Sequence, residues 1–312
     1  MQKKVSILLI TYNPSWDKYR QTLYSIITQK NIEFSLVISD DGSDNDYFDL
    51  AEKYLKNNNF TSYRFLKNIK NQGIVKNILL GLSVIDEKYV KLISPGDFLY
   101  DNNTLKNFVD FAEKNPATLY FGNMFCYSLD SKGNIIYFDN KKNPYDLRPW
   151  KKNDYKIIKK NYIVKCDRIC GATIMYNTEK FKSYLEKICG FVSFAEDCAV
   201  TYMIAKNEPI FFMNVNGGIW YEYGAGISTQ KNNLWNDRIK SDFKNLYTHL
   251  LEEQIIPKWN YRMYFAENKI ERLILLFLKN PNTYFEHLFK KKIKGYKDIK
   301  YNKDELKKIL EI

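Results

Sequence analysis

The stretch Tyr89-Val90-Lys91-Leu92-Ile93-Ser94-Pro95-Gly96-Asp97-Phe98-Leu99 decides the fold. Its first five residues form a mostly apolar run, as in a buried strand, and Ser-Pro-Gly follows. Because Pro95 cannot donate a hydrogen bond to a sheet and Gly96 tolerates a left-handed turn, the strand must end there. Asp97 is therefore predicted at the carboxyl end of a buried strand, the edge where open α/β sheets bind ligands. A carboxylate held at that edge is typical of a site for a divalent cation and a phosphorylated ligand.

Two further apolar runs, residues 5–10 and 34–39, precede this stretch. Each is nearly continuous, as expected of a strand buried on both faces of a parallel sheet, and a helical pattern separates them. Strand, helix and strand in this order predict a right-handed βαβ unit. The first run ends at Thr11-Tyr12-Asn13 and the second at Asp40-Asp41-Gly42-Ser43, so polar side chains follow both strands. The second segment is equally compatible with a simple turn before a helix.

The segment Asn71-Gln72-Gly73-Ile74-Val75-Lys76-Asn77 opens another predicted helix. A glycine just ahead of a helix suggests close approach of the backbone to a ligand, and helix N-termini attract phosphate. Lys76 lies one turn into the helix and could add to that attraction. An ordinary loop with a solvated lysine explains the same residues.

The second half of the chain adds two candidate segments. Gly171 and Ala172 begin a predicted strand at a turn of small residues, and Glu196-Asp197 begins a predicted helix. Acidic residues are favoured at a helix start by the helix dipole, even without a function. Residues 128–162 are polar and rich in lysine, which predicts a hairpin and a mobile loop, and residues 217–228 predict a loop of glycines and aromatic side chains.

The composition favours some function classes and excludes others. A formal charge of +12, from 48 basic and 36 acidic side chains, favours an anionic partner. No recognised nucleic-acid-binding motif is present, so we expect no nucleic acid partner. The first predicted strand ends in Thr-Tyr-Asn-Pro rather than a glycine-rich loop, which argues against a dinucleotide-dependent dehydrogenase and a nucleotidyltransferase. Five cysteines without a Cys-x-x-Cys pair indicate free thiols in a reducing cytosol, and no signal peptide or transmembrane helix is expected.

The chain turns helical near residue 231, so we predict a catalytic domain at 1–230 and a C-terminal helical region at 231–312. Residues 279–312 contain ten lysines against five acidic residues. Apolar residues beside Lys290, Lys291, Lys292 and Lys294 predict a basic amphipathic helix. Such a helix is typical of contact with an anionic membrane surface, although docking on the catalytic domain would explain it equally well.

Taken in order, these motifs over residues 4–230 resemble the family 2 glycosyltransferases. The resemblance implies an α/β fold with a Rossmann-like nucleotide-sugar-binding sheet, the type A glycosyltransferase fold, followed here by the C-terminal helical extension. Two departures from the family pattern matter. Lys76 stands where the family usually has arginine, and Asp97 is the last carboxylate of a metal motif whose other aspartates are replaced by Ser94 and Gly96.

The resemblance also implies roles for individual residues. Asp40 or Asp41 would accept a hydrogen bond from a uracil ring, Asp97 would hold Mn²⁺ or Mg²⁺ against the diphosphate, and Asp197, or otherwise Glu196, would be the general base. The other predicted donor-side residues are Thr11, Tyr12, Asn13, Asn71, Gly73, Lys76 and Ser94. The predicted acceptor or sugar side comprises Gly171, Ala172, Trp220, Tyr221 and Tyr223, although the three aromatic residues fit core packing as well.

The predicted function is therefore metal-dependent, inverting transfer of a hexose or N-acetylhexosamine. The donor would be a UDP-sugar, and the acceptor a sugar hydroxyl of a lipid-linked glycan in bacterial polysaccharide biosynthesis. The basic C-terminal region predicts a cytoplasmic enzyme in peripheral contact with the inner face of the cell membrane. A homo-oligomer is compatible with the sequence. The alternative is a non-catalytic nucleotide-sugar-binding partner of another transferase, which the reduced metal motif favours and Glu196-Asp197 opposes.

Overall fold

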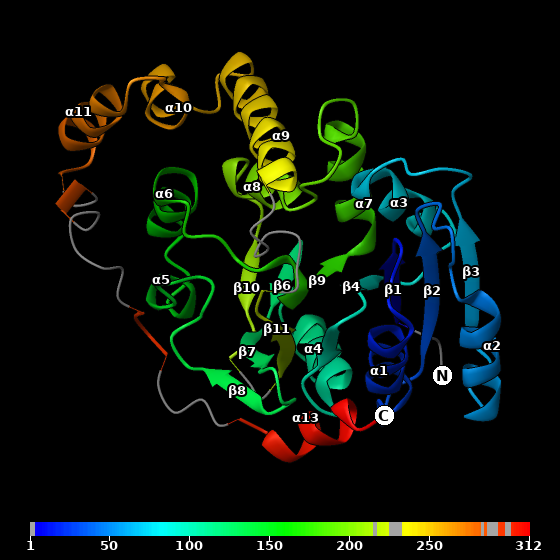
Figure 1. Cartoon of the computed structure of the whole chain (residues 1–312). Helices are drawn as coiled ribbons and strands as arrows, with labels where there is room; N and C mark the ends of the chain where they lie inside the picture. The colour runs from blue at the N-terminus through cyan, green and yellow to red at the C-terminus, as the bar shows by residue number, and fades with distance from the viewer. Residues whose placement is uncertain (1–3, 215–216, 225–232, 282–283, 286–292, 297–300) are drawn as a thin grey trace.

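The computed structural model describes residues 4–214, 217–224, 233–281, 284–285, 293–296 and 301–312 (Figure 1). A seven-stranded sheet in the order β10-β6-β9-β4-β1-β2-β3 forms its centre. Its strands are β1 (Val5–Thr11), β2 (Phe34–Asp40), β3 (Tyr63–Lys67), β4 (Tyr89–Ile93), β6 (Leu119–Phe121), β9 (Ile174–Asn177) and β10 (Ile210–Phe212). Strands β4, β1, β2 and β3 run parallel, and β9 runs antiparallel to both of its neighbours.

Helices cover both faces of this sheet, because successive residues of each strand face opposite sides. In β1, Leu8 packs into one core with α3, whereas Ile7 and Leu9 pack into a second core with α1, α2 and α4. The helices of the α/β region are α1 (Trp16–Ile27), α2 (Phe48–Asn57), α3 (Ile74–Leu82), α4 (Thr104–Lys114), α7 (Thr178–Ile188) and α8 (Cys198–Ala205). Burial on both faces explains the nearly continuous apolar runs and confirms the predicted α/β fold.

A second sheet, in the order β5-β11-β7-β8, lies beside the first. Its strands are β5 (Asp97–Leu99), β7 (Asn123–Leu129), β8 (Ile135–Phe138) and β11 (Gly218–Glu222). The prediction of a glycine-aromatic loop is therefore wrong for residues 218–222. Gly218 permits the strand, since a Cβ atom there would lie 2.0 Å from the carbonyl oxygen of Asn123. Residues 225–228 of that segment lie outside the described residues.

The segment at 128–162 contains more structure than its composition predicts. Besides β8 it holds α5 (Arg148–Lys151) and most of α6 (Tyr155–Lys165). One face of α6 is apolar and buried, and it consists of Ile158, Tyr162 and Ile163. Polar residues lie between these three in the sequence, so the apolar pattern of the helix was not recognised there. A short 3₁₀ turn, η1 (Gly171–Thr173), then leads into β9.

The C-terminal region begins with α9 (Asn233–Glu252), α10 (Lys258–Phe265) and α11 (Lys269–Lys279) and ends with α13 (Lys303–Leu310). Helix α13 lies beside α1 (Figure 1). Leu306 and Ile309 of α13 are buried in one cluster with Trp220 and the aromatic residues of the second sheet. The end of the chain thus completes a core of the α/β region. The amphipathic helix predicted around Lys290–Lys294 lies largely outside the described residues.

Candidate active site

A cleft of about 610 Å³ opens at the carboxyl edge of β1, β2 and β4. Four of the predicted carboxylate residues, from three separate segments of the sequence, line it together: Asp41, Asp97, Glu196 and Asp197. Two more predicted site residues that line the cleft, Ala172 and Tyr221, are described below. Six others also line it: Thr11, Tyr12, Asn13, Asn71, Ser94 and Gly171. The strands bring these residues together because parallel neighbours end at the same edge.

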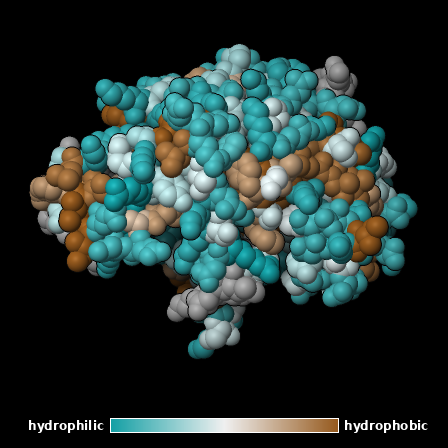
Figure 2. Space-filling view, turned by 90° about the horizontal axis from the view of Figure 1, so that it is seen from above, coloured by the Kyte–Doolittle hydropathy of each residue, from teal (hydrophilic) through white to brown (hydrophobic). Residues whose placement is uncertain are grey.

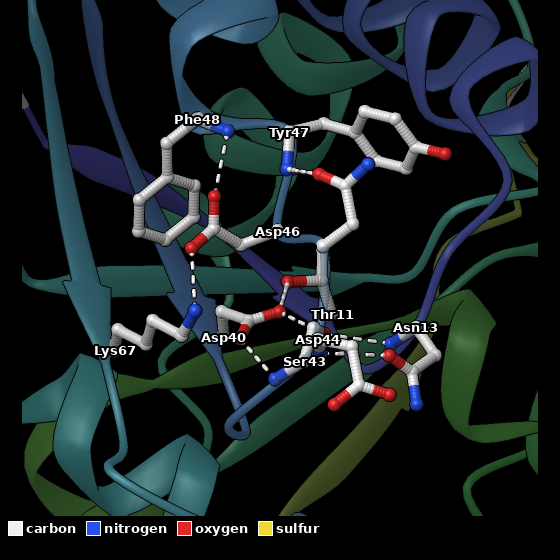
Figure 3. A network of polar contacts seen from close by, with 10 residues as sticks. Thr11, Asn13, Asp40, Ser43, Asp44, Asp46, Tyr47, Phe48 and Lys67 are labelled. Atoms are coloured by element: carbon white, nitrogen blue, oxygen red, sulfur yellow. Dashed lines mark hydrogen bonds and ion pairs between the residues drawn. The ribbon is translucent and has the colours of Figure 1, made fainter.

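Asp40, the last residue of β2, belongs to a network of polar contacts with Thr11 and Ser43 and does not line this cleft (Figure 3). Its fully buried carboxylate accepts hydrogen bonds from the Thr11 hydroxyl at 2.8 Å and from the backbone N–H and hydroxyl of Ser43 at 2.7 and 2.5 Å. The Ser43 hydroxyl oxygen also accepts a hydrogen bond from the backbone N–H of Asn13. Because Asp40 does not line the cleft, the structure corrects the prediction that it contacts a donor base. Its side chain instead fixes the turn that presents Asp41.

Asp41 faces the cleft and organises the loop that follows β3. Its carboxylate accepts hydrogen bonds from the Asn68 side chain and from the backbone N–H groups of Gln72 and Gly73, each at 2.9 Å. Burial nevertheless raises the pKa of the Asp41 carboxyl above its ordinary value. An ionised carboxylate has about four lone-pair sites, so one remains for a ligand N–H.

Gly73 and Lys76 do not occupy the positions predicted for them. Gly73 has φ of +90°, and a Cβ atom there would lie 2.7 Å from the backbone oxygen of Ser193, so the glycine permits close approach of another backbone segment rather than a ligand. Lys76 is exposed and does not line the cleft. The next residue, Asn77, lines it instead and exchanges hydrogen bonds with Ser39. The helix turn carries Lys76 away from the site.

Asp97 follows the turn that ends β4 and has charged neighbours of both signs. Burial raises the pKa of its carboxyl to about 7, and the nearby ammonium group of Lys91 opposes the shift. Lys91 is fully buried below the cleft and donates hydrogen bonds to the backbone oxygens of Leu92 and Ala172. On the cleft side, Lys18 and Glu222 form an ion pair at 2.5 Å. Two carboxylates and two ammonium groups therefore surround the position where the sequence predicts a metal.

Glu196 and Asp197 lie in the turn that begins α8, and α9 holds this turn in place. Asp242 of α9 is buried, and its carboxylate accepts hydrogen bonds from the backbone N–H groups of Ser193, Phe194 and Ala195 at 3.2, 2.7 and 2.9 Å. Burial and the neighbouring Asp197 raise the pKa of Glu196 to about 8. Burial also raises the pKa of Asp197, against the charge of Arg168. Raised carboxyl pKa values are typical of groups that exchange protons near neutral pH.

The predicted acceptor-side residues divide between the cleft and the core. Gly171, Ala172 and Tyr221 line the cleft. Trp220 is fully buried in the second sheet, where its indole N–H donates to the backbone oxygen of Tyr100 at 3.0 Å. Tyr223 does not line the cleft and lies under the Lys141 ammonium group. The prediction that Trp220 and Tyr223 contact the acceptor or the sugar is therefore wrong. Side chains alternate along β11, and this alternation directs Trp220 into the core.

Several cleft residues are not among the predicted site residues, although Asn77 belongs to the quoted segment 71–77. They are Lys18, Asn77, Arg168, Glu222, Trp235 and Phe243. The last two belong to α9, so the cleft draws on both of the regions that the sequence divides at residue 230. Such residues can be recognised as part of the site only from the fold, in which helices distant in sequence pack against the sheet edge.

The match to a family model over residues 6–185, described as glycosyl transferase family 2, covers more than half of the chain. The chain belongs to glycosyl transferase family 2. No similar protein was found among those with curated descriptions. Two similar solved structures are TarS 1–349 from S. aureus, free and in complex with UDP-GlcNAc, at 18% and 17% identity, with TM-scores of 0.52 and 0.57. Each match covers 92% of this chain and 75% or 76% of TarS, which shows the type A glycosyltransferase fold.

Proposed function

We propose that this family 2 enzyme transfers a hexose or N-acetylhexosamine from a UDP-sugar to a sugar hydroxyl of a glycan acceptor, with inversion. One observation carries the proposal: Asp41, Asp97 and Asp197, which belong to three separate motifs, line the same cleft. The UDP and UDP-GlcNAc complexes of the similar TarS structures support a UDP-sugar as the donor.

The donor nucleotide would lie between the ends of β1 and β2. The remaining acceptor site of the Asp41 carboxylate suits the N–H of a uracil ring, and the Tyr12 side chain, 47% exposed, offers a ring beside it. Lys18 lines the same cleft near Asp97 and provides a positive charge for a diphosphate. A donor held in this way would share the cleft with Asp197.

A divalent metal would be held by Asp97, and family 2 enzymes commonly use one. Its carboxylate, with that of Glu222 nearby, provides the oxygen ligands that Mg²⁺ and Mn²⁺ prefer. Within the described ranges no three His, Cys, Asp or Glu side chains converge, so the diphosphate and water would supply the other ligands. When bound, the metal offsets the negative charge that develops on the leaving diphosphate.

The Asp197 carboxylate would take the proton of the acceptor hydroxyl as its oxygen bonds to the anomeric carbon. The bond from that carbon to the diphosphate breaks at the same time, and its electron pair leaves with UDP. Attack from the face opposite the diphosphate inverts the anomeric centre. Phe194 and Ala195 line the cleft beside the turn that begins α8, and burial raises the pKa of the Asp197 carboxyl, which favours its acceptance of a proton.

Release of UDP from a panel of UDP-sugars, with bacterial membrane glycans as acceptors and Mn²⁺ present, tests this function. We expect acceptor-stimulated UDP release with at least one donor and none with GDP-sugars. Binding of UDP without any turnover would instead support the alternative, a non-catalytic nucleotide-sugar-binding partner of another transferase.

We further propose that the enzyme lies against the anionic inner face of the cell membrane, where a lipid-linked acceptor would be available. Helix α11 exposes a stripe at helical spacing: Ile270, Leu273, Ile274, Phe277 and Leu278, each 40–66% exposed. Figure 2 shows apolar residues gathered at the edge where α11 lies. Lys269, Arg272 and Lys279 belong to the same helix, and an apolar stripe with basic residues suits an anionic bilayer. No helix in the described residues is long and apolar enough to span a membrane.

Replacing Ile274, Phe277 and Leu278 by serine should abolish flotation of the full chain with vesicles that contain phosphatidylglycerol. The variant loses the apolar contact with the bilayer, and each buried apolar side chain contributes roughly 1.5–3 kcal/mol to the free energy of binding. Replacing the exposed apolar residue Ile69, which lies far from α11 in the sequence, is the matched control and should leave flotation unchanged. Equal flotation of both variants would refute a role for α11.

A further inference from the structure

The ion pair between Lys18 and Glu222 joins two walls of the cleft. Lys18 belongs to α1, Glu222 is the last residue of β11, and both line the cleft. The ammonium nitrogen and the carboxylate oxygen lie 2.5 Å apart, which makes this a close, charge-assisted hydrogen bond. The Lys18 side chain is 40% exposed and that of Glu222 is 19% exposed, so a ligand that enters the cleft can reach the pair.

Contacts on both sides place this pair beside Asp97. The Thr22 hydroxyl, one turn further along α1 than Lys18, accepts a hydrogen bond from the Gly96 N–H at 3.0 Å. The same hydroxyl donates to the backbone oxygen of Asp97 at 3.1 Å, and β11 pairs with the strand β5 that begins at Asp97. A Cβ atom on Gly96 would lie 3.4 Å from the Cδ atom of Lys18 and 4.0 Å from a carboxylate oxygen of Glu222. The ion pair therefore lies in contact with Gly96, the residue that precedes Asp97.

The Lys18 ammonium group can serve a diphosphate as well as a carboxylate. It has three N–H donors, and the oxygens of a phosphate group and of a carboxylate accept the same kind of charge-assisted hydrogen bond. The carboxylates of Asp97 and Glu222 line the same part of the cleft, so a diphosphate that enters there needs a cation. Glu222 and the diphosphate would thus compete for one ammonium group.

We propose that Lys18 binds the diphosphate of the donor and that Glu222 is an internal competitor for Lys18, so that the ion pair opens when the donor binds and closes when UDP leaves. The inference rests on the proposed glycosyl transfer. While the pair is open, Lys18 donates to the diphosphate. When UDP leaves, the re-formed ion pair offsets the loss of that contact. Glu222 thereby weakens the binding of UDP and favours release of the product.

The test is the Kd of UDP for Lys18→Gln, Glu222→Gln and the unchanged full chain, measured by titration calorimetry in EDTA. EDTA removes divalent ions, so ligation of a metal by Glu222 does not contribute. Lys18→Gln loses the contact with the diphosphate, and its Kd should rise about tenfold or more. Glu222→Gln frees the ammonium group, and its Kd should fall about two- to fivefold, because a partly exposed ion pair is a weak competitor.

Lys56→Gln and Glu52→Gln are the matched controls. Lys56 and Glu52 form an ion pair at 3.1 Å on α2, and neither residue lines the cleft. Each control changes the net charge of the chain in the same way as its counterpart in the cleft. Both should leave the Kd of UDP unchanged.

Opposite shifts in Lys18→Gln and Glu222→Gln distinguish competition from a structural brace, because loss of a brace would weaken UDP binding in both variants. A shift in only one of the two variants, no shift, or shifts in the same direction would contradict the inference. So would binding of UDP by the unchanged chain only in the presence of Mn²⁺, because Lys18 would then not hold the diphosphate. Failure of the proposed function is distinguishable, because the unchanged chain would then bind UDP neither in EDTA nor with Mn²⁺.

Discussion

Replacing Asp197 by Asn is expected to lower kcat by about 10²–10⁴-fold, the usual contribution of a general base. The amide is close in size to the carboxylate but cannot take the proton of an acceptor hydroxyl. The midpoint of thermal unfolding should rise with UDP as much as in the unchanged enzyme, because Asp41 and the β1 end are untouched. Initial rates of UDP release and thermal unfolding, measured on one preparation, separate the two effects.

Glu196→Gln is the matched control for this replacement. Because Asp197 remains in place in this variant, Glu196→Gln should cost far less activity than the loss of Asp197. Unchanged turnover in Asp197→Asn would contradict the assignment of the base.

Asp242→Ala is expected to have the largest effect on stability. Its carboxylate accepts three backbone hydrogen bonds that hold the turn before Glu196, and hydrogen bonds to a charged group each contribute roughly 1.5–3 kcal/mol. Because water will satisfy some of the freed N–H groups, we expect a loss of about 4 kcal/mol in the free energy of unfolding, measured by urea denaturation. Turnover should fall by about 10²-fold at temperatures where the variant is folded, since the catalytic carboxylates are displaced.

Asp237→Ala provides the comparison on the same helix, because the Asp237 side chain is 73% exposed and pairs with Lys240 at 3.4 Å. This replacement should change the free energy of unfolding by no more than about 0.5 kcal/mol. Equal stability of the two variants would show that α9 does not hold the α8 turn.

The strands of the central sheet could be predicted from the sequence, because a strand that is buried on both faces is a nearly continuous apolar run, as in residues 89–93. It also predicted that carboxylates from distant parts of the chain meet at one edge of the sheet, and Asp41, Asp97 and Asp197 line one cleft there. Trp220 shows a limit of this reasoning. The sequence showed an aromatic cluster, but whether a side chain faces the cleft or the core depends on strand pairing that only the fold reveals.

Lys76 and Gly73 show a second limit. A basic residue one turn into a helix points to the site or away from it according to how the helix packs, and α3 packs so that Asn77 faces inward. The glycine was correctly recognised as a place of close approach, but its neighbour is the backbone at Ser193. The places of Arg168 and Asp242 beside the cleft could not be predicted, because they depend on contacts between segments 47 or more residues apart.

Selective stabilisation by UDP tests the central claim most directly, namely that Asp41 and the other cleft carboxylates form a UDP-sugar site. At a UDP concentration of 100 times Kd, binding adds about 2.7 kcal/mol to the free energy of unfolding, which a thermal midpoint registers clearly. We predict that the midpoint of thermal unfolding rises with UDP and UDP-GlcNAc and rises much less with GDP. In Asp41→Asn, UDP should no longer raise the midpoint. No rise with UDP, or an equal rise in Asp41→Asn, would contradict the account.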